Sequence, residues 1–297
     1  MSKILVCGLV NMETTVFVSD FPVEYCPIDY NFFGVSSYPA GVGLNLSLAF
    51  NSLSDEVRLL SMVGEDSAGQ VVRNVLIDNK ISTEYLEKSG YTAQSVVLYD
   101  KSGRRRIFCD LKDMQEKSYN EDIFKKAAED CDTLCLCNIN FSRNLLKIAK
   151  DMGKRIACDV HVLADINDDY NRDFMMNADI LFLSNENILG REKEFVEELK
   201  NTYNNEIIVV GLGSKGALLY ERESDNFHIQ EAVKTREVVN TVGAGDSLFS
   251  SFVHYYTKTN DAKLSLKYAC TFASYKIGEN GAAKGFLTES ELENLMK

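Results

Sequence analysis

The chain reads Asn240-Thr241-Val242-Gly243-Ala244-Gly245-Asp246 where a glycine-rich turn meets an apolar helical sequence, with a carboxylate at the join. Glycines lack a Cβ, so the backbone can turn tightly and approach a ligand. The first N–H groups of a helix have no intrahelical partner and, together with the helix dipole, attract phosphate. A carboxylate beside such donors can accept a proton from an attacking hydroxyl. The stretch therefore predicts phosphoryl transfer.

Asp246 also has a purely structural interpretation. Aspartate is among the preferred helix N-caps, and the glycines could simply shape the loop before the helix. The residues of this stretch leave both interpretations open: a capped helix without chemistry, or an anion site with a general base.

The stretch resembles the D-T-x-G-A-G-D signature of the ribokinase-like (phosphofructokinase-B) sugar kinase family at six of seven positions, with Asn240 replacing the first Asp. In that family the last Asp is the catalytic base and the Gly-Ala-Gly amides form an anion hole. The resemblance implies that Asp246 is the base. It places the anion hole at Gly243, Ala244 and Gly245, and an adjoining nucleotide contact at Thr241.

Composition and charge limit the classes of function. The 297 residues, 45% hydrophobic and 26% charged, are enough for one large α/β core and include no low-complexity linker. A net charge of −12 argues against nucleic acid as a partner, since its backbone requires clustered Lys and Arg. No apolar run has the length of a membrane span or signal peptide. We therefore expect a cytoplasmic protein with no membrane partner.

The eight cysteines fit a reducing compartment, and most lie in apolar segments where they replace small hydrophobic residues. Cys131, Cys135 and Cys137 could be imagined as metal ligands. Their spacing matches no usual zinc site, and strand alternation puts Cys135 and Cys137 on one face. We interpret these cysteines as core residues.

Two segments near the N-terminus indicate a substrate site. Residues 4–10 predict a strand that ends at Asn11-Met12-Glu13, the ligand-binding edge of a doubly wound sheet. A second glycine turn precedes a helix that runs to about Leu53. The two segments resemble the family motifs N-x-D and G-G-x-x-x-N-x-A, with Val42 replacing the second glycine. The resemblance implies substrate contacts at Asn11, Glu13, Gly41, Gly43 and Asn45.

Alternating segments near residues 12–36 and 92–111 predict short strands outside the main sheet, which we interpret as a lid. The turn between two of them carries Arg104 and Arg105, either as solvated charge or as a phosphate contact. One face of this lid sheet would lack covering helices. That face predicts a homodimer formed through the lid.

From Asp122 onward, helical and strand patterns alternate, which predicts right-handed βαβ units and a parallel sheet. One strand closes at Asp159-Val160-His161, where we interpret His161 as a structural hydrogen-bonding residue. The motifs follow the family order along nearly the whole chain. The resemblance implies a single domain over residues 1–297 with a ribokinase-like three-layer α/β fold: a central, mostly parallel sheet flanked by helices, and a small β-sheet lid.

Residues 211–216 formally satisfy the dinucleotide pattern G-x-G-x-x-G, but the sequence that follows alternates as a strand instead of opening a helix. The family's nucleotide loop fits better. It implies ATP contacts at Gly213, Ser214, Lys215 and Gly216. Asn185 matches the start of the family's N-x-x-E motif, which helps to hold magnesium, while Ile188 stands where the Glu should be. No residue is therefore assigned as a metal ligand.

The predicted function is ATP-dependent phosphorylation of a hydroxyl on a small sugar or sugar derivative, with Mg²⁺ bridging the phosphates. A nucleoside kinase is one alternative, with Tyr38, Phe32 or Phe33 stacking on a base. Another is a non-catalytic sugar-binding regulatory protein, which the departures at Val42, Ile188 and Asn240 would favour. The lost carboxylates at positions 188 and 240 predict weak or absent activation by a monovalent cation.

Overall fold

The computed structural model describes all residues, 1–297. Its larger sheet has nine strands: β1 (Lys3–Cys7), β4 (Glu56–Gly64), β5 (Leu86–Ser89), β8 (Thr133–Leu136), β9 (Arg155–Val162), β10 (Ile180–Ser184), β11 (Ile207–Gly211), β12 (Ala217–Glu221) and β13 (Asn226–Gln230). Their order is β13-β12-β11-β10-β9-β8-β1-β4-β5. Only β12 runs against its neighbours, since it pairs antiparallel with β11 and β13. The predicted parallel sheet is confirmed.

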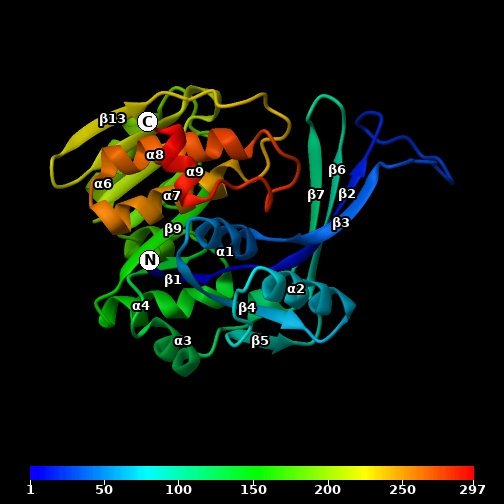
Figure 1. Cartoon of the computed structure of the whole chain (residues 1–297), viewed down its shortest axis with the longest axis horizontal. Coiled ribbons are helices and arrows are strands. Elements are labelled where there is room, and N and C mark those ends of the chain that lie inside the picture. Colours follow the sequence, from blue (N-terminus) through cyan, green and yellow to red (C-terminus); the bar gives the residue numbers. More distant parts are fainter.

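Helices cover both faces of this sheet (Figure 1). On one face lie α1 (Val42–Ser52), α2 (Ser67–Asp78), α7 (Ala244–Thr259), α8 (Ala262–Lys276) and α9 (Glu289–Leu295). On the other lie α3 (Glu121–Ala128), α4 (Arg143–Asp151), α5 (Arg172–Asn177) and α6 (Glu192–Thr202). Alternate residues of β1 enter the two cores, Ile4 on the first face and Leu5 on the second. Burial on both faces explains why the sheet strands are almost continuously apolar.

A second sheet stands to one side of this body, with the tips of its strands projecting (Figure 1). It contains β2 (Asn11–Phe17), β3 (Val35–Ala40), β6 (Ala93–Tyr99) and β7 (Arg105–Asp110), in the order β3-β2-β6-β7. β2 pairs antiparallel with β3 and parallel with β6, and β6 and β7 form an antiparallel hairpin. β6 and β7 fall in the segment 92–111 that the sequence predicts for a lid, and β2 begins one residue before the predicted segment 12–36. β3 lies mostly beyond that segment.

The structure corrects three local predictions in this region. The first strand ends at Cys7, and Asn11–Glu13 do not form a turn but begin β2. The segment 32–34 is not extended but precedes β3 as a turn, with Phe33 at φ +60°. Pro39 and Ala40 end β3 rather than opening the glycine turn. Pairing of Asn11 with both Ala40 and Ala93 decides where β2 begins and where β3 ends, and such non-local pairing leaves no mark in the local pattern.

The strand order reverses between β1 and β8, because the chain adds β4 and β5 on one side and β8 to β13 on the other. The two strands approach closely just beyond their carboxyl ends. A Cβ on Gly8, after β1, would lie 2.6 Å from Sγ of Cys137, after β8. In open α/β sheets such a reversal leaves a crevice where ligands bind.

The three cysteines considered as metal ligands belong to the core. Cys135 and Cys137 lie in one apolar layer, as strand alternation predicts, and Cys131 lies in the other. In this structure no helix combines the length and the apolar character that crossing a membrane requires.

One buried polar contact supports this architecture far from the crevice. Nδ1 of His254, on α7, lies 2.6 Å from Oδ2 of Asp55, and both side chains are completely buried. We expect His254→Leu to destabilise the fold by about 3–5 kcal/mol, because it leaves the Asp55 carboxylate buried without its partner. The measurement is the urea unfolding midpoint, with His228→Leu on the edge strand β13 as the control.

Adding Asp55→Asn to His254→Leu should recover part of this loss, since no charge then remains unpaired. Wild-type unfolding of the single variant, or a double variant weaker than the single one, would contradict this account of the pair.

Candidate active site

The glycine-rich stretch leads directly into α7, which begins at Ala244 with Gly243 as its N-cap residue. Gly243 has φ +78°, a left-handed conformation that favours glycine. A Cβ there would lie 2.8 Å from the carbonyl oxygen of Ala282, so the close packing also requires glycine. Asp246 lies in the first helical turn and is not the cap. The interpretation of Asp246 as an N-cap is therefore wrong.

Several N–H groups of this turn have no partner within the protein. Ala244 N donates to the carbonyl of Thr241 over 3.2 Å, whereas Gly243, Gly245 and Asp246 donate no backbone hydrogen bond. Asn240 shapes the approach, because its Oδ1 accepts from Val242 N at 2.9 Å. The unpaired N–H groups and the positive end of the α7 dipole can attract an anion, so this turn, residues 243–246, is called the anion-binding corner.

The Asp246 carboxylate lies beside this corner and is held from α1. Nδ2 of Asn45 donates to its Oδ2 over 2.7 Å. Burial raises the pKa of Asp246 above its ordinary value, and the Asp159 charge raises it further. The Asn45 hydrogen bond and the charges of His161 and Lys276 oppose this shift. A partly buried carboxylate with a raised pKa is suited to accept a proton.

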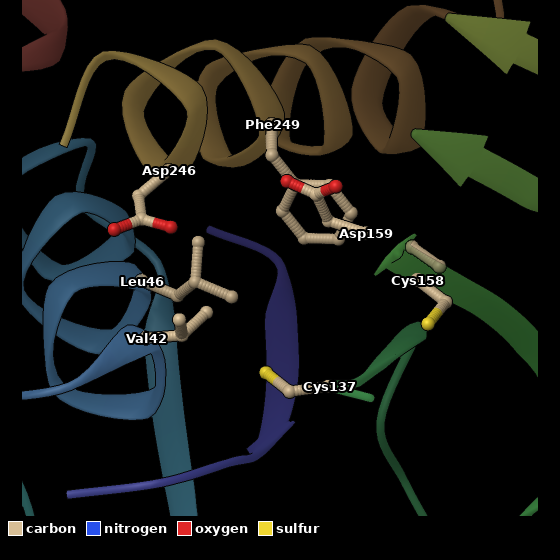
Figure 2. A pocket seen from close by; sticks show the side chains of 8 residues that line it. Val42, Leu46, Cys137, Cys158, Asp159, Asp246 and Phe249 are labelled. Atoms are coloured by element: carbon tan, nitrogen blue, oxygen red, sulfur yellow. The ribbon is translucent and has the colours of Figure 1, made fainter. Parts of the chain in front are cut away.

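Asp246 and Asp159 line one small pocket with apolar side chains from α1 and α7 (Figure 2). Asp159 lies near the end of β9, where its Oδ1 accepts from His161 N at 2.8 Å and its Oδ2 lies 3.6 Å from His161 Nδ1. His161 adopts φ +60°, a strained conformation for a residue other than glycine. Strain of this kind tends to occur at functional sites. The His161 ring lies beside the Asp159 carboxylate, and its charge acts on Asp246. Its role as a structural hydrogen-bonding residue stays a prediction.

The five predicted substrate residues are brought together by direct contacts. A Cβ on Gly41 would lie 3.1 Å from Oδ1 of Asn11. Gly43 N donates to the carbonyl oxygen of Leu9, two residues before Asn11. Asn11 Nδ2 donates to Ser95 Oγ at 2.9 Å, and Ser95 Oγ lies 3.3 Å from Oε2 of Glu13. Asn45 connects this group to Asp246.

Glu13 is held within the lid by two of its strands. Tyr38 OH, on β3, donates to Oε1 over 3.2 Å, and Ser95 on β6 contacts the other oxygen. Burial and the Glu13 charge raise the pKa of Tyr38 to about 12, so the phenol stays a donor. By contrast, Phe32 and Phe33 are 81% and 104% exposed. Of the three aromatic residues considered for base stacking, only Tyr38 lies among the substrate candidates.

Apart from Thr241, which lies in the loop before α7, the predicted nucleotide residues follow β10 and β11 at the same sheet edge. Gly213, Ser214 and Lys215 form a short 3₁₀ turn before β12, and no dinucleotide-type helix follows. Asn185 is buried at the end of β10, and its Nδ2 donates to Oε1 of Glu192 at 2.9 Å. That bond lowers the pKa of Glu192, and the Lys215 charge lowers it further.

Ile188 is 2% exposed in the apolar core and offers nothing to a ligand. Glu192, four residues later, instead brings a carboxylate to Asn185. Glu192 lies outside the motif spacing, so no motif in the sequence marks it. Only the turn after β10 returns it to the site.

Two further residues near Asp246 belong to no motif recognised in the sequence. Asp159 could have been found as an acid at the end of a strand, where doubly wound folds bind ligands. Lys276 ends α8 and is completely buried, although its charge acts on Asp246. No sequence signal distinguishes it from the many surface lysines of helices.

Known proteins resemble this chain over its whole length. A family model described as pfkB family carbohydrate kinase matches residues 1–289. The ribokinase of Dictyostelium discoideum is 27% identical over 326 aligned positions, which cover 98% of this chain and 99% of that protein.

Solved structures show the same fold. A microbiome-derived acarbose kinase, Mak1, superimposes with a TM-score of 0.88 at 21% identity, covering 99% of this chain and 98% of its own. Ribokinase from Arabidopsis thaliana, complexed with ribose and ATP, gives 0.83 at 19% identity, covering 100% and 99%. The predicted ribokinase-like fold is confirmed, and the protein is a sugar or nucleoside kinase. Because the family model spans nearly all of it, the chain belongs to the pfkB family of carbohydrate kinases.

Proposed function

We propose that this protein transfers the γ-phosphoryl group of ATP to a hydroxyl of a small sugar or sugar derivative. One observation carries the proposal. The Asp246 carboxylate, held by Asn45 at 2.7 Å, lies in the same helical turn as backbone N–H groups that have no partner. A base and an anion-binding corner so placed can serve one reacting hydroxyl and one phosphoryl group.

The polar atoms around this base favour a ligand rich in hydroxyls. Oδ1 of Asn11 and Oδ1 of Asn45 are buried and accept no hydrogen bond. Buried acceptors are rarely left without a partner, and hydroxyl donors of a ligand would complete both. Glu13 adds a carboxylate from the lid. A ribose within a nucleoside offers similar hydroxyls, so nucleosides belong in the same substrate panel.

The nucleotide would lie along the carboxyl ends of β10 and β11. Gly213, Ser214, Lys215 and Gly216 would contact ATP there, with Asn185 and Thr241 nearer the phosphates. Glu192 and Asn185 offer the oxygen ligands that Mg²⁺ prefers, and Lys215 offers a positive charge. Two oxygen-bearing side chains fit a magnesium ion that keeps most of its coordination to water and phosphate oxygens.

In the proposed reaction, Asp246 accepts the proton as the sugar hydroxyl oxygen attacks the γ-phosphorus. A new O–P bond forms while the bond to the leaving ADP oxygen breaks. The N–H groups of Gly243 and Gly245 would hold the negative charge on the phosphoryl oxygens, with Ala244 fixing the turn between them. Magnesium, when bound with ATP, supplies charge neutralisation between the phosphates.

Asp246→Asn tests the role of the base. The amide keeps the size of the side chain but cannot accept the hydroxyl proton, so kcat should fall by about 10²–10⁴. ATP affinity should change little, since the proposed ATP contacts lie elsewhere. The measurements are turnover with the best compound from a panel of sugars and nucleosides, and ATP binding by calorimetry.

Asp261→Asn is the matched control, because Asp261 caps α8 through Leu264 N and lies outside this site. Turnover of Asp246→Asn at the wild-type rate would remove Asp246 as the base. A wild-type protein that consumes no ATP with any compound would instead favour the non-catalytic regulatory alternative.

The cation requirement follows from Asn240 and Ile188. The amide oxygen of Asn240 is engaged with Val242 N, and Ile188 lies in the core, so neither supplies a carboxylate to a bound ion. We expect turnover to require Mg²⁺ and to show weak or no activation by potassium. The measurement is turnover across 0 to saturating KCl at constant ionic strength. A large increase in turnover with KCl would contradict the expected weakness of potassium activation.

The lid predicts a homodimer. Its strand β7 is exposed along its whole length, and Phe108 at 47% lies with Val35 of β3, at 54%, on the face opposite Glu13. Apolar side chains on an uncovered sheet favour pairing with a second copy. Sedimentation at micromolar concentration should show a dimer that Phe108→Glu weakens. A wild-type monomer would contradict the assembly.

A further inference from the structure

Lys276 has no role in the reaction as described, yet it is one of the most buried charged residues in the chain. It ends α8 and is 0% exposed, although lysine is rarely buried unless it is paired. Its Nζ donates to the carbonyl oxygen of Val242, 34 residues earlier, in the loop immediately before Gly243. The contact joins α8 to the anion-binding corner.

The chain just after Lys276 supports the same loop. The carbonyl of Ile277 accepts from Val239 N at 2.8 Å and from Asn240 N at 3.0 Å. Ala282 packs against Gly243 so closely that no Cβ fits between them. The end of α8 is therefore the surface on which residues 239–243 lie, and the Lys276 ammonium is embedded in it.

The charge of Lys276 is not neutralised by an ion pair, since no carboxylate lies within 4.0 Å of its Nζ. Asp246 from α7 and Glu279 beyond α8 attract it at longer range, and Arg236 repels it. Burial lowers the pKa of Lys276 to about 8, so the ammonium is largely charged near neutral pH. Away from bulk water, one such charge acts strongly on neighbouring groups.

We propose that Lys276 is a positioning residue for phosphoryl transfer: its buried ammonium fixes the Val242 carbonyl and supplies an internal positive charge behind the amides of Gly243 and Gly245. The inference rests on the proposed reaction at Asp246. The charge attracts the anion toward the corner and favours the ionised form of the Asp246 carboxylate. A lysine ammonium bound to a backbone carbonyl thus occupies a place that a small monovalent cation could take.

Lys276→Met tests the charge, since methionine keeps most of the packing volume. Removing one direct oxyanion donor costs about 10²–10³ in kcat, so a charge one residue behind the donors should cost about 10- to 100-fold. The thermal midpoint should stay close to wild type, because the cost of burying the charge disappears with it. Lys267→Met, an exposed lysine of the same helix, is the matched control and should behave as wild type.

Two readouts separate this role from a merely structural one. The wild-type kcat should fall as pH rises through about 8, where the ammonium loses its proton, and Lys276→Met should lack that decline. In Lys276→Ala, ammonium, methylammonium or potassium ions should restore part of the lost turnover, because the shortened side chain leaves room for a cation at the Val242 carbonyl. The same ions should leave wild type unchanged.

A third readout needs no sugar: the ratio of ATP to ADP affinity, measured by calorimetry, should fall in Lys276→Met. A Lys276→Met protein with wild-type kcat, pH profile and ATP preference would overturn the role of Lys276 and leave that of Asp246 intact. A loss of turnover that no cation restores, with an unchanged alkaline decline, would also overturn it. Absence of turnover by wild type with every compound would overturn the proposed function itself.

Discussion

The hydrogen bond between Asn45 and Asp246 joins two helices whose residues are 201 positions apart in the chain. It holds the first turn of α7 against the first turn of α1. The anion-binding corner therefore lies beside the hydrogen-bonded side chains of Asn11, Ser95 and Glu13. Both helices pack on one face of the central sheet, so their N-terminal ends meet above the point where the strand order reverses. Every proposed step depends on this meeting, because the base must reach a hydroxyl and a phosphoryl group together.

Burial has opposite consequences for the two charged groups near this corner. It raises the pKa of Asp246 and lowers the pKa of Lys276, so each is biased toward its neutral form. Their mutual attraction favours the charged forms of both. The charged pair is the combination that accepts a proton at Asp246 and attracts a phosphate at the corner.

In the proposed function, the lid contributes specificity by a different means. Its strands bring Glu13, Tyr38 and Ser95 into one hydrogen-bonded group and leave apolar residues on the outer surface. The inner group can contact hydroxyls, whereas the outer residues favour another protein surface. In this proposal, one small sheet serves both the substrate site and the assembly, because alternate residues of a strand face opposite sides.

Sequence alone determined the parallel α/β class, the two glycine turns and the placement of Asp246 beside a helix start, because helical periodicity, strand alternation and glycine spacing are local properties. It also excluded a dinucleotide site at residues 211–216, since the alternating residues after them predict a strand and not a helix. Only the tertiary structure decided that Asp246 is not a cap, that Glu192 returns to Asn185, and that Lys276 lies buried beneath Val242. These facts depend on contacts between segments distant in the chain, and no local pattern records which distant residue will fill a given space.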